Sequence, residues 1–104
     1  MKPTLRPKVK ICCIQNIAEA RMAVDNGASA IGLVSEMPSG PGPIPEERIA
    51  EIAATIPVGV STFLLTSKQD APSIIRQQKR TGANTLQIVD VVPFDTYRQL
   101  RDSI

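Results

Sequence analysis

The chain has 104 residues, a length that predicts one small domain spanning residues 1–104. Its twelve Lys and Arg residues nearly balance ten Asp and Glu residues and are scattered, so we expect no nucleic-acid partner, which would need a clustered basic excess. The absence of histidine excludes a histidine-based triad or metal site. We expect neither a metal nor another cofactor.

The sequence shows no membrane-directed segment. No run approaches the roughly 20 apolar residues of a membrane span, and the basic residues 1–10 are not followed by the apolar stretch of a signal peptide. The two cysteines, Cys12 and Cys13, are adjacent, and a disulfide between neighbouring residues is strained. We therefore expect two reduced thiols, a cytoplasmic location and no membrane partner.

Strand-like apolar runs alternate with helical patterns along the chain. Helix starts are indicated by Asn16, with an acidic residue three positions later, by Pro45 as a first helical residue, and by Asp70. Gly27 and Gly82 indicate helix ends. The expected elements, in chain order, are a strand at 9–14, a helix between Asn16 and Gly27, a strand at 30–34, a helix at 45–56, a strand at 58–65, a helix between Asp70 and Gly82, a strand at 85–89 and a helix at 94–101.

This order of elements predicts the fold class. Four strand–helix pairs in succession predict an α/β fold with a parallel sheet and right-handed crossovers, a (βα)4 arrangement. The strands are continuous apolar runs, which is typical of a parallel sheet buried on both faces. The loop at 35–45 holds four prolines and two glycines, so neither helix nor strand is expected there.

Candidate functional residues follow the predicted strands, because catalytic residues of parallel α/β folds gather at the carboxyl ends of strands. Cys12 and Cys13 end the first strand, and alternation predicts that one points toward the site and the other toward a helix. A thiol there is either a base or nucleophile, or a small buried hydrophobe. Gln87 lies in the fourth apolar run, where a buried amide needs a ligand or neighbouring backbone as its partner. Asp90 is either an acid or a cap or turn residue.

The stretch VKICCIQNIAEARMAVDNGASAIGLV, residues 9–34, resembles the opening of the phosphoribosylanthranilate isomerase family. That family begins with a Val-Lys-Ile-Cys-Gly strand, then Ile-Thr, a helix that ends before Gly-Ala, and a strand of the Ala-(Leu/Ile)-Gly-(Phe/Leu)-Val type. Further matches are the Pro-Glu helix start at Pro45, a Val-Gly-Val strand at 58–63, and Gln-Leu-His-Gly, which reads Gln-Ile-Val-Asp at 87–90. The resemblance covers nearly the whole chain, and Lys-Ile-Cys is its most specific part.

This resemblance implies half of a TIM (β/α)8 barrel and an Amadori rearrangement in tryptophan biosynthesis, which converts N-(5-phosphoribosyl)anthranilate to a 1-deoxyribulose phosphate. Cys12 corresponds to the family's general base, which removes the proton from C2′. Gln87 is our candidate for binding this small phosphosugar. The family's general acid and phosphate loops belong to its second half, so we expect the 104-residue chain alone to be inactive. It would be a fragment of a longer product, or pair with a second copy or a separate second half-barrel.

The sequence also departs from the family pattern. Cys13 stands where the family has glycine, and Val89 replaces the histidine of Gln-Leu-His-Gly. The loop at 35–45 has no counterpart of the arginine thought to hold the anthranilate carboxylate. Two alternatives therefore stay open: a non-catalytic, self-associating βα scaffold or subunit, and a divergent barrel enzyme for another phosphosugar or aromatic ligand.

Overall fold

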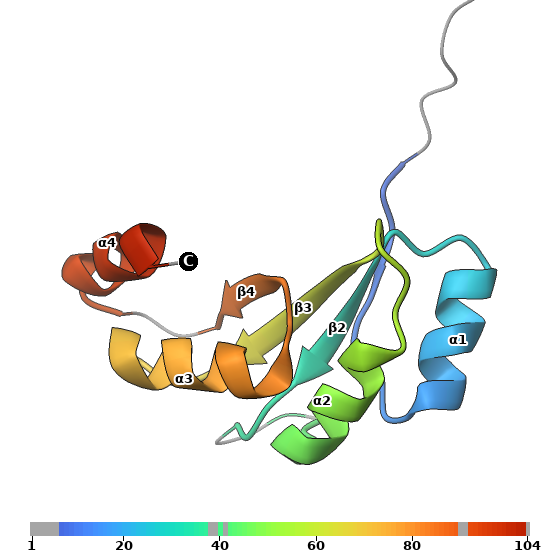
Figure 1. Cartoon of the computed structure of the whole chain (residues 1–104), viewed down its shortest axis with the longest axis horizontal. Helices are drawn as coiled ribbons and strands as arrows, with labels where there is room; N and C mark the ends of the chain where they lie inside the picture. The colour runs from blue at the N-terminus through green and yellow to red at the C-terminus, as the bar shows by residue number, and fades with distance from the viewer. Residues whose placement is uncertain (1–6, 38–39, 41, 90–91, 104) are drawn as a thin grey trace, which may run out of the picture.

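Four strands alternate with four helices in the computed structural model, which describes residues 7–37, 40, 42–89 and 92–103 (Figure 1). The elements are β1 (Lys10–Ile11), α1 (Ile17–Asp25), β2 (Ala30–Val34), α2 (Glu46–Ala54), β3 (Ser61–Thr66), α3 (Ala71–Thr81), β4 (Thr85–Ile88) and α4 (Phe94–Ser103). The α/β class and the fourfold βα order predicted from the sequence are confirmed.

The strands form one parallel sheet in the order β1-β2-β3-β4. Ile11 lies opposite Ile31 in this register, and Leu65 lies opposite Gln87. Each strand therefore pairs only with its neighbours in the sequence. The sheet does not close within the described residues, so β1 and β4 are its outer strands.

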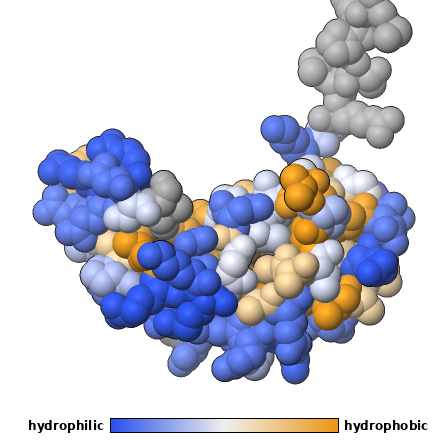
Figure 2. Space-filling view, in the orientation of Figure 1, coloured by the Kyte–Doolittle hydropathy of each residue, from blue (hydrophilic) through white to orange (hydrophobic). Residues whose placement is uncertain are grey.

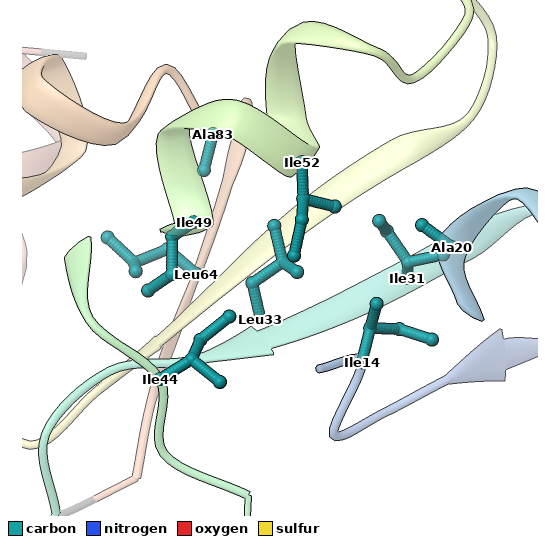
Figure 3. Close-up of a cluster of buried hydrophobic side chains, with 9 residues drawn as sticks. All are labelled: Ile14, Ala20, Ile31, Leu33, Ile44, Ile49, Ile52, Leu64 and Ala83. Atoms are coloured by element: carbon teal, nitrogen blue, oxygen red, sulfur yellow. The ribbon is translucent and has the colours of Figure 1, made fainter. Parts of the chain in front are cut away.

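The two faces of the sheet have different surroundings because side chains alternate along each strand. One face, the helix face, carries Ile31, Leu33 and Leu64, which are buried in one cluster with Ile49 and Ile52 of α2 (Figure 3). The opposite face is called the inner face here. Its residues are the alternate members of each strand: Lys10, Ala30, Gly32, Val34, Ser61, Phe63, Leu65, Thr85 and Gln87.

The helices bury apolar stripes against the helix face. Ala20 of α1 joins the central cluster, while Ile74 of α3 and Leu100 of α4 form a second cluster against Leu86 and Ile88 of β4. Figure 2 shows the outward surface over the helices as mainly hydrophilic, with smaller apolar patches. This distribution is the expected one for amphipathic helices that cover one side of a sheet.

Local hydrogen bonds explain where α1 and α3 begin. The Asn16 side chain accepts a hydrogen bond from the backbone N–H of Glu19 at 2.8 Å, and the Glu19 carboxylate accepts one from the N–H of Gln15 at 2.6 Å. Asp70 caps α3 in the same way by accepting the N–H of Ser73 at 3.0 Å. Both caps were predicted, because Asn and Asp side chains satisfy the exposed N–H groups of a first turn.

The start of α2 differs from the prediction. Pro45 was expected as the first helical residue but is the N-cap, with φ −60° and ψ 149°, and the helix begins at Glu46. An N-cap residue takes an extended backbone, and the fixed φ of proline is compatible with that conformation as well as with a helix.

Three strand predictions are corrected by the structure. The first strand spans 10–11 rather than 9–14, and the fourth ends at Ile88 rather than at 89. The third begins at Ser61, not at Val58, because Gly59 has φ 103° and belongs to a turn.

The predicted burial of the strands on both faces holds for β2 but not across the whole sheet. β1 is exposed and β4 is half-buried, since each of these outer strands pairs on one side only.

None of the helices in the described part of the chain could cross a membrane. The longest, α3, has 11 residues, about half of what a span requires.

An ion pair joins the start of α2 to the end of α3. Arg80 donates through Nε to Glu46 Oε1 at 2.9 Å and through Nη2 to Glu46 Oε2 at 3.1 Å. This hydrogen bonding from Arg80 lowers the pKa of the Glu46 carboxyl. The pair therefore stabilises the fold at pH values above the ordinary carboxyl pKa, and its contribution is lost as the pH falls through the lowered value.

We expect Glu46→Gln to be less stable than the wild type near neutral pH, and the difference in the free energy of unfolding to shrink toward about pH 3. Urea unfolding followed by circular dichroism at both pH values measures this difference. Glu47→Gln, at an exposed neighbour in the same turn, is the control, and its free energy of unfolding near neutral pH should fall less than that of Glu46→Gln. A stability difference for Glu46→Gln that does not change with pH would contradict the role of the ion pair.

Candidate active site

A bulge at the end of β1 carries both cysteines. The register sets Ile11 opposite Ile31, and an unbroken parallel ladder would then join the Cys13 N–H to the carbonyl of Gly32. Instead, the N–H of Ile14 bonds to this carbonyl at 3.2 Å. One extra residue is inserted, which explains why the strand is shorter than predicted.

Cys12 lies at the carboxyl end of β1 on the inner face. A β-carbon built on Gly32, which would point to that face, would lie 2.8 Å from Cys12 Sγ and 3.1 Å from Cys12 Cα. The thiol is thus seated against the one residue of β2 that has no side chain. Cys12 as a whole residue is exposed, so this end of β1 lies at the surface of the described part of the chain.

Cys13 has a backbone conformation that favours glycine. Its φ is 58°, and it is the only non-glycine residue with positive φ in the described part of the chain. A side chain in this left-handed region costs about 1–2 kcal/mol. The position is the one at which the similar family has glycine, so the bulge keeps a glycine-type backbone while its residue has changed.

We expect Cys13→Gly to raise the free energy of unfolding by about 0.5–1 kcal/mol, because the gain from removing left-handed strain exceeds the added freedom of the unfolded chain. Urea unfolding measures this change. Cys13→Ala removes the same sulfur but keeps the strain, so it should not stabilise the chain. Equal shifts in the two variants would show that the sulfur, rather than the backbone, determines the effect.

The two thiols also influence each other. Partial desolvation raises the pKa of the Cys13 thiol, and the neighbouring Cys12 raises it further through its charge and through a hydrogen bond between the side chains. A thiol held in its protonated form is a poorer base. The raised pKa of Cys13 disfavours it as a base, and the position on the inner face is a separate reason to keep Cys12 as the candidate.

Gln87 lies on β4, at the far side of the inner face from Cys12. It is half-buried rather than buried, and its Oε1 accepts a hydrogen bond from Nζ of Lys10 on β1. The same ammonium lies 4.7 Å from the centroid of the Phe63 ring. A contact between the first and last strands requires a sheet that curls toward its inner face. Our sequence reasoning missed Lys10, although alternation alone places it on the face of Cys12.

Other residues at the strand ends hold the loops together. The Ser35 hydroxyl donates to the carbonyl of Leu65 at 2.8 Å, and the Ser67 hydroxyl donates to the carbonyl of Glu36 at 2.9 Å. Asp90, the acid candidate, lies outside the described residues. Among the residues that are described, no group of three or more His, Cys, Asp or Glu side chains could hold a metal ion.

The fold and the strand-end thiol define an open parallel βα protein, built from the unit that TIM barrels repeat. No protein-family model matches the chain. Curated proteins named N-(5′-phosphoribosyl)anthranilate isomerase are similar to it. The one from Halorubrum lacusprofundi is 30% identical over 82 residues, which cover 78% of this chain and 38% of the relative. The one from Alcanivorax borkumensis is 44% identical over 59 residues, which cover 57% of this chain and 27% of the relative. The chain is thus a relative of these isomerases, and the resemblance found in the sequence is confirmed.

Solved structures give the same result. The phosphoribosylanthranilate isomerase of Thermotoga maritima matches with a TM-score of 0.85 and 26% identity over 93% of this chain and 47% of that chain. The isomerase of Pyrococcus furiosus matches with a TM-score of 0.83 and 26% identity, and the match covers 95% of this chain and 48% of that chain. A third match is a phosphoribosylanthranilate isomerase in complex with reduced 1-(o-carboxyphenylamino)-1-deoxyribulose 5-phosphate. Its TM-score is 0.85 and its identity 26%, and the match covers 93% of this chain and 50% of that chain. The chain spans half or less of the length of these relatives.

Proposed function

We propose that this chain is the part of a phosphoribosylanthranilate isomerase that carries the general base, and that Cys12 is that base. The observation that carries the proposal is the position of Cys12. It is exposed at the carboxyl end of β1, on the inner face and against the bare backbone of Gly32. In parallel βα folds this end of the strands is where reactions take place. The similarity to the isomerases supplies the substrate class.

The proposed chemistry is a proton transfer. When the sugar ring opens, the nitrogen-bearing carbon becomes an iminium carbon, which acidifies the proton on the adjacent C2′. The Cys12 thiolate takes this proton, the electron pair moves into an enolamine, and tautomerisation gives the 1-deoxyribulose phosphate. A positioned base typically contributes about 10²–10⁴-fold to such a step if its pKa is close to the working pH.

We assign substrate binding on the inner face to Gln87 acting through Lys10. The Gln87 amide oxygen and the Phe63 ring hold the Lys10 ammonium over this face. The ligand in the similar isomerase complex carries a carboxyl group and a phosphate, both of which an ammonium group attracts. Lys10 would thus provide a cation that the loop at 35–45 does not, since that loop contains neither Arg nor Lys.

The remaining parts of the site must come from outside these four βα units. The resemblance assigns the general acid and the phosphate loops to the second half of the barrel. The outer strands β1 and β4 each pair with one neighbour, so each has an edge to which a further strand can add. We propose that this second half is supplied by further chain or by a partner, and that the 104-residue chain alone does not turn over substrate.

The test is conversion of N-(5-phosphoribosyl)anthranilate, followed by the change in fluorescence of its anthranilate group. The native product is purified from its source, so that any further chain or partner is retained, and its mass is determined. The 104-residue chain is assayed beside it. We expect turnover by the native product and none by the chain alone. A native product without turnover would reject the isomerase proposal.

A second candidate function is a non-catalytic, self-associating βα scaffold or subunit. The exposure of the outer strand β1 and the valine at position 89 favour it. Sedimentation analysis of the native product with the reduced deoxyribulose phosphate analogue separates the two functions. A stable assembly that does not bind the analogue supports the scaffold, and binding of the analogue supports the isomerase.

A further inference from the structure

The side chain of Gln15 links the end of β1 to the loop that follows β2. Gln15 is half-buried, and its Nε2 donates a hydrogen bond to the carbonyl of Gly42 at 3.1 Å. The two residues lie 27 positions apart in the sequence, so this bond joins two separate strand ends rather than neighbours in one turn.

The segment that accepts this bond is fixed to the sheet on its other side. We call residues 42–44 the strap. The N–H of Ile44 donates to the carbonyl of Val34 at 2.9 Å, and Pro43 forms a parallel bridge with Val34. Ile44 is buried in the central cluster, which also contains Ile14 from the bulge (Figure 3). The strap therefore lies along the end of β2 and shares its core with the bulge.

The bulge needs such support because its backbone is strained. Cys13 has φ 58°, and a side chain in this region persists only where the surrounding structure determines it. Gly42 packs against Cys13, since a β-carbon built on Gly42 would lie 2.7 Å from Cys13 Sγ. The strap is thus a wall for the bulge, and Gln15 is a side chain that ties the bulge to this wall.

We propose that Gln15 is a positioning residue for Cys12. By holding the bulge against the strap, it keeps Cys12 in place at the carboxyl end of β1. This inference rests on the proposed function of Cys12 as the general base, and it gives Gln15 no contact with the substrate. A displacement of about 1 Å in an active site can cost about 10²-fold in rate. The hydrogen bond to Gly42 therefore contributes to proton transfer as well as to stability.

The first measurement is hydrogen exchange in the native product carrying Gln15→Met. Methionine has a similar length and fills a similar space, but it has no N–H to donate. We expect the N–H of Ile44 to exchange about 2–12-fold faster than in the wild type, the factor that corresponds to the loss of one hydrogen bond. Exchange at Ile44 that does not change would show that Gln15 does not hold the strap, and would overturn the proposal.

The second measurement is steady-state kinetics with N-(5-phosphoribosyl)anthranilate. We expect Gln15→Met to lower the turnover number by about 10–100-fold and to change the Michaelis constant much less, because a displaced base affects the proton-transfer step. Gln15→Lys keeps a donor whose reach is one atom longer, and it should restore most of the turnover. Circular dichroism confirms that each variant is folded.

Ser29→Ala is the matched control, because it removes a side-chain tie at the opposite end of β1. The Ser29 hydroxyl accepts the N–H of Val9 at 3.0 Å and donates to the carbonyl of Val9 at 3.2 Å. This variant loses hydrogen bonds to the backbone, as Gln15→Met does, but far from Cys12 along the strand. Its turnover number should stay close to that of the wild type.

The positioning role is rejected if Gln15→Met keeps the wild-type turnover, if Gln15→Lys is as impaired as Gln15→Met, or if Ser29→Ala loses as much. A raised Michaelis constant with an unchanged turnover number would also reject it, because Gln15 would then shape only a binding surface. These outcomes require an active wild type. A wild-type native product without turnover rejects the isomerase proposal itself, and the role of Gln15 falls with it.

Discussion

Leu33→Ala is expected to lower the free energy of unfolding by about 2–5 kcal/mol, the largest stability loss that we predict for this chain. Leu33 is fully buried on the helix face of β2, in one cluster with Ile49 and Ile52 of α2 (Figure 3). Truncation removes buried apolar contacts and leaves a cavity between sheet and helix. The total free energy of unfolding of a domain is about 5–15 kcal/mol, so urea unfolding should detect this loss clearly.

Met22→Ala is the control for this prediction. Met22 lies on α1 with 64% of its surface exposed, and alanine favours a helix, so the free energy of unfolding should change by about 0.5 kcal/mol or less. Losses of similar size in the two variants would show that the packing of α2 on the sheet does not dominate the stability.

If the native product is the isomerase that we propose, Cys12→Ser is expected to reduce its turnover number by about 10²–10⁴-fold, the usual contribution of a positioned general base. Serine has nearly the same shape, but its hydroxyl does not ionise near neutral pH. The Michaelis constant should change much less than the turnover number, because the lost interaction belongs to the proton-transfer step. Steady-state kinetics with N-(5-phosphoribosyl)anthranilate measures both constants.

Cys13→Ser is the matched control for the activity measurement, with a much smaller expected loss. It keeps the left-handed backbone and removes only the neighbouring thiol. Circular dichroism of both variants excludes unfolding as the cause. If Cys13→Ser lost as much turnover as Cys12→Ser, the assignment of the base to Cys12 would be wrong.

Local chemistry made much of the fold predictable. Asn16, Asp70 and Gly82 mark helix ends in the sequence, and they do so in the structure because each satisfies or ends a helical turn by itself. The strand at 30–34 was predicted with its observed bounds, since an apolar run between two helices has few alternatives. The order of elements then determines the parallel sheet.

The candidate site was less predictable because it depends on contacts between distant residues. The bulge at Cys13 is defined by which N–H bonds the carbonyl of Gly32, and no local pattern indicates that choice. The contact between Lys10 and Gln87 depends on the curl of the whole sheet. Cys12 was selected through its resemblance to the family, and the structure adds the face on which it lies.

The sequential order of the strands has a consequence for how this chain folds. Every strand pairs with the strand next to it in the sequence, so no pairing must wait for a distant segment. During synthesis, β2 can dock on β1 as soon as α1 has formed, and each later βα unit can add to the edge left by the one before. The growing chain can thus acquire its sheet one unit at a time, and the stability that each unit gains depends on the unit already in place.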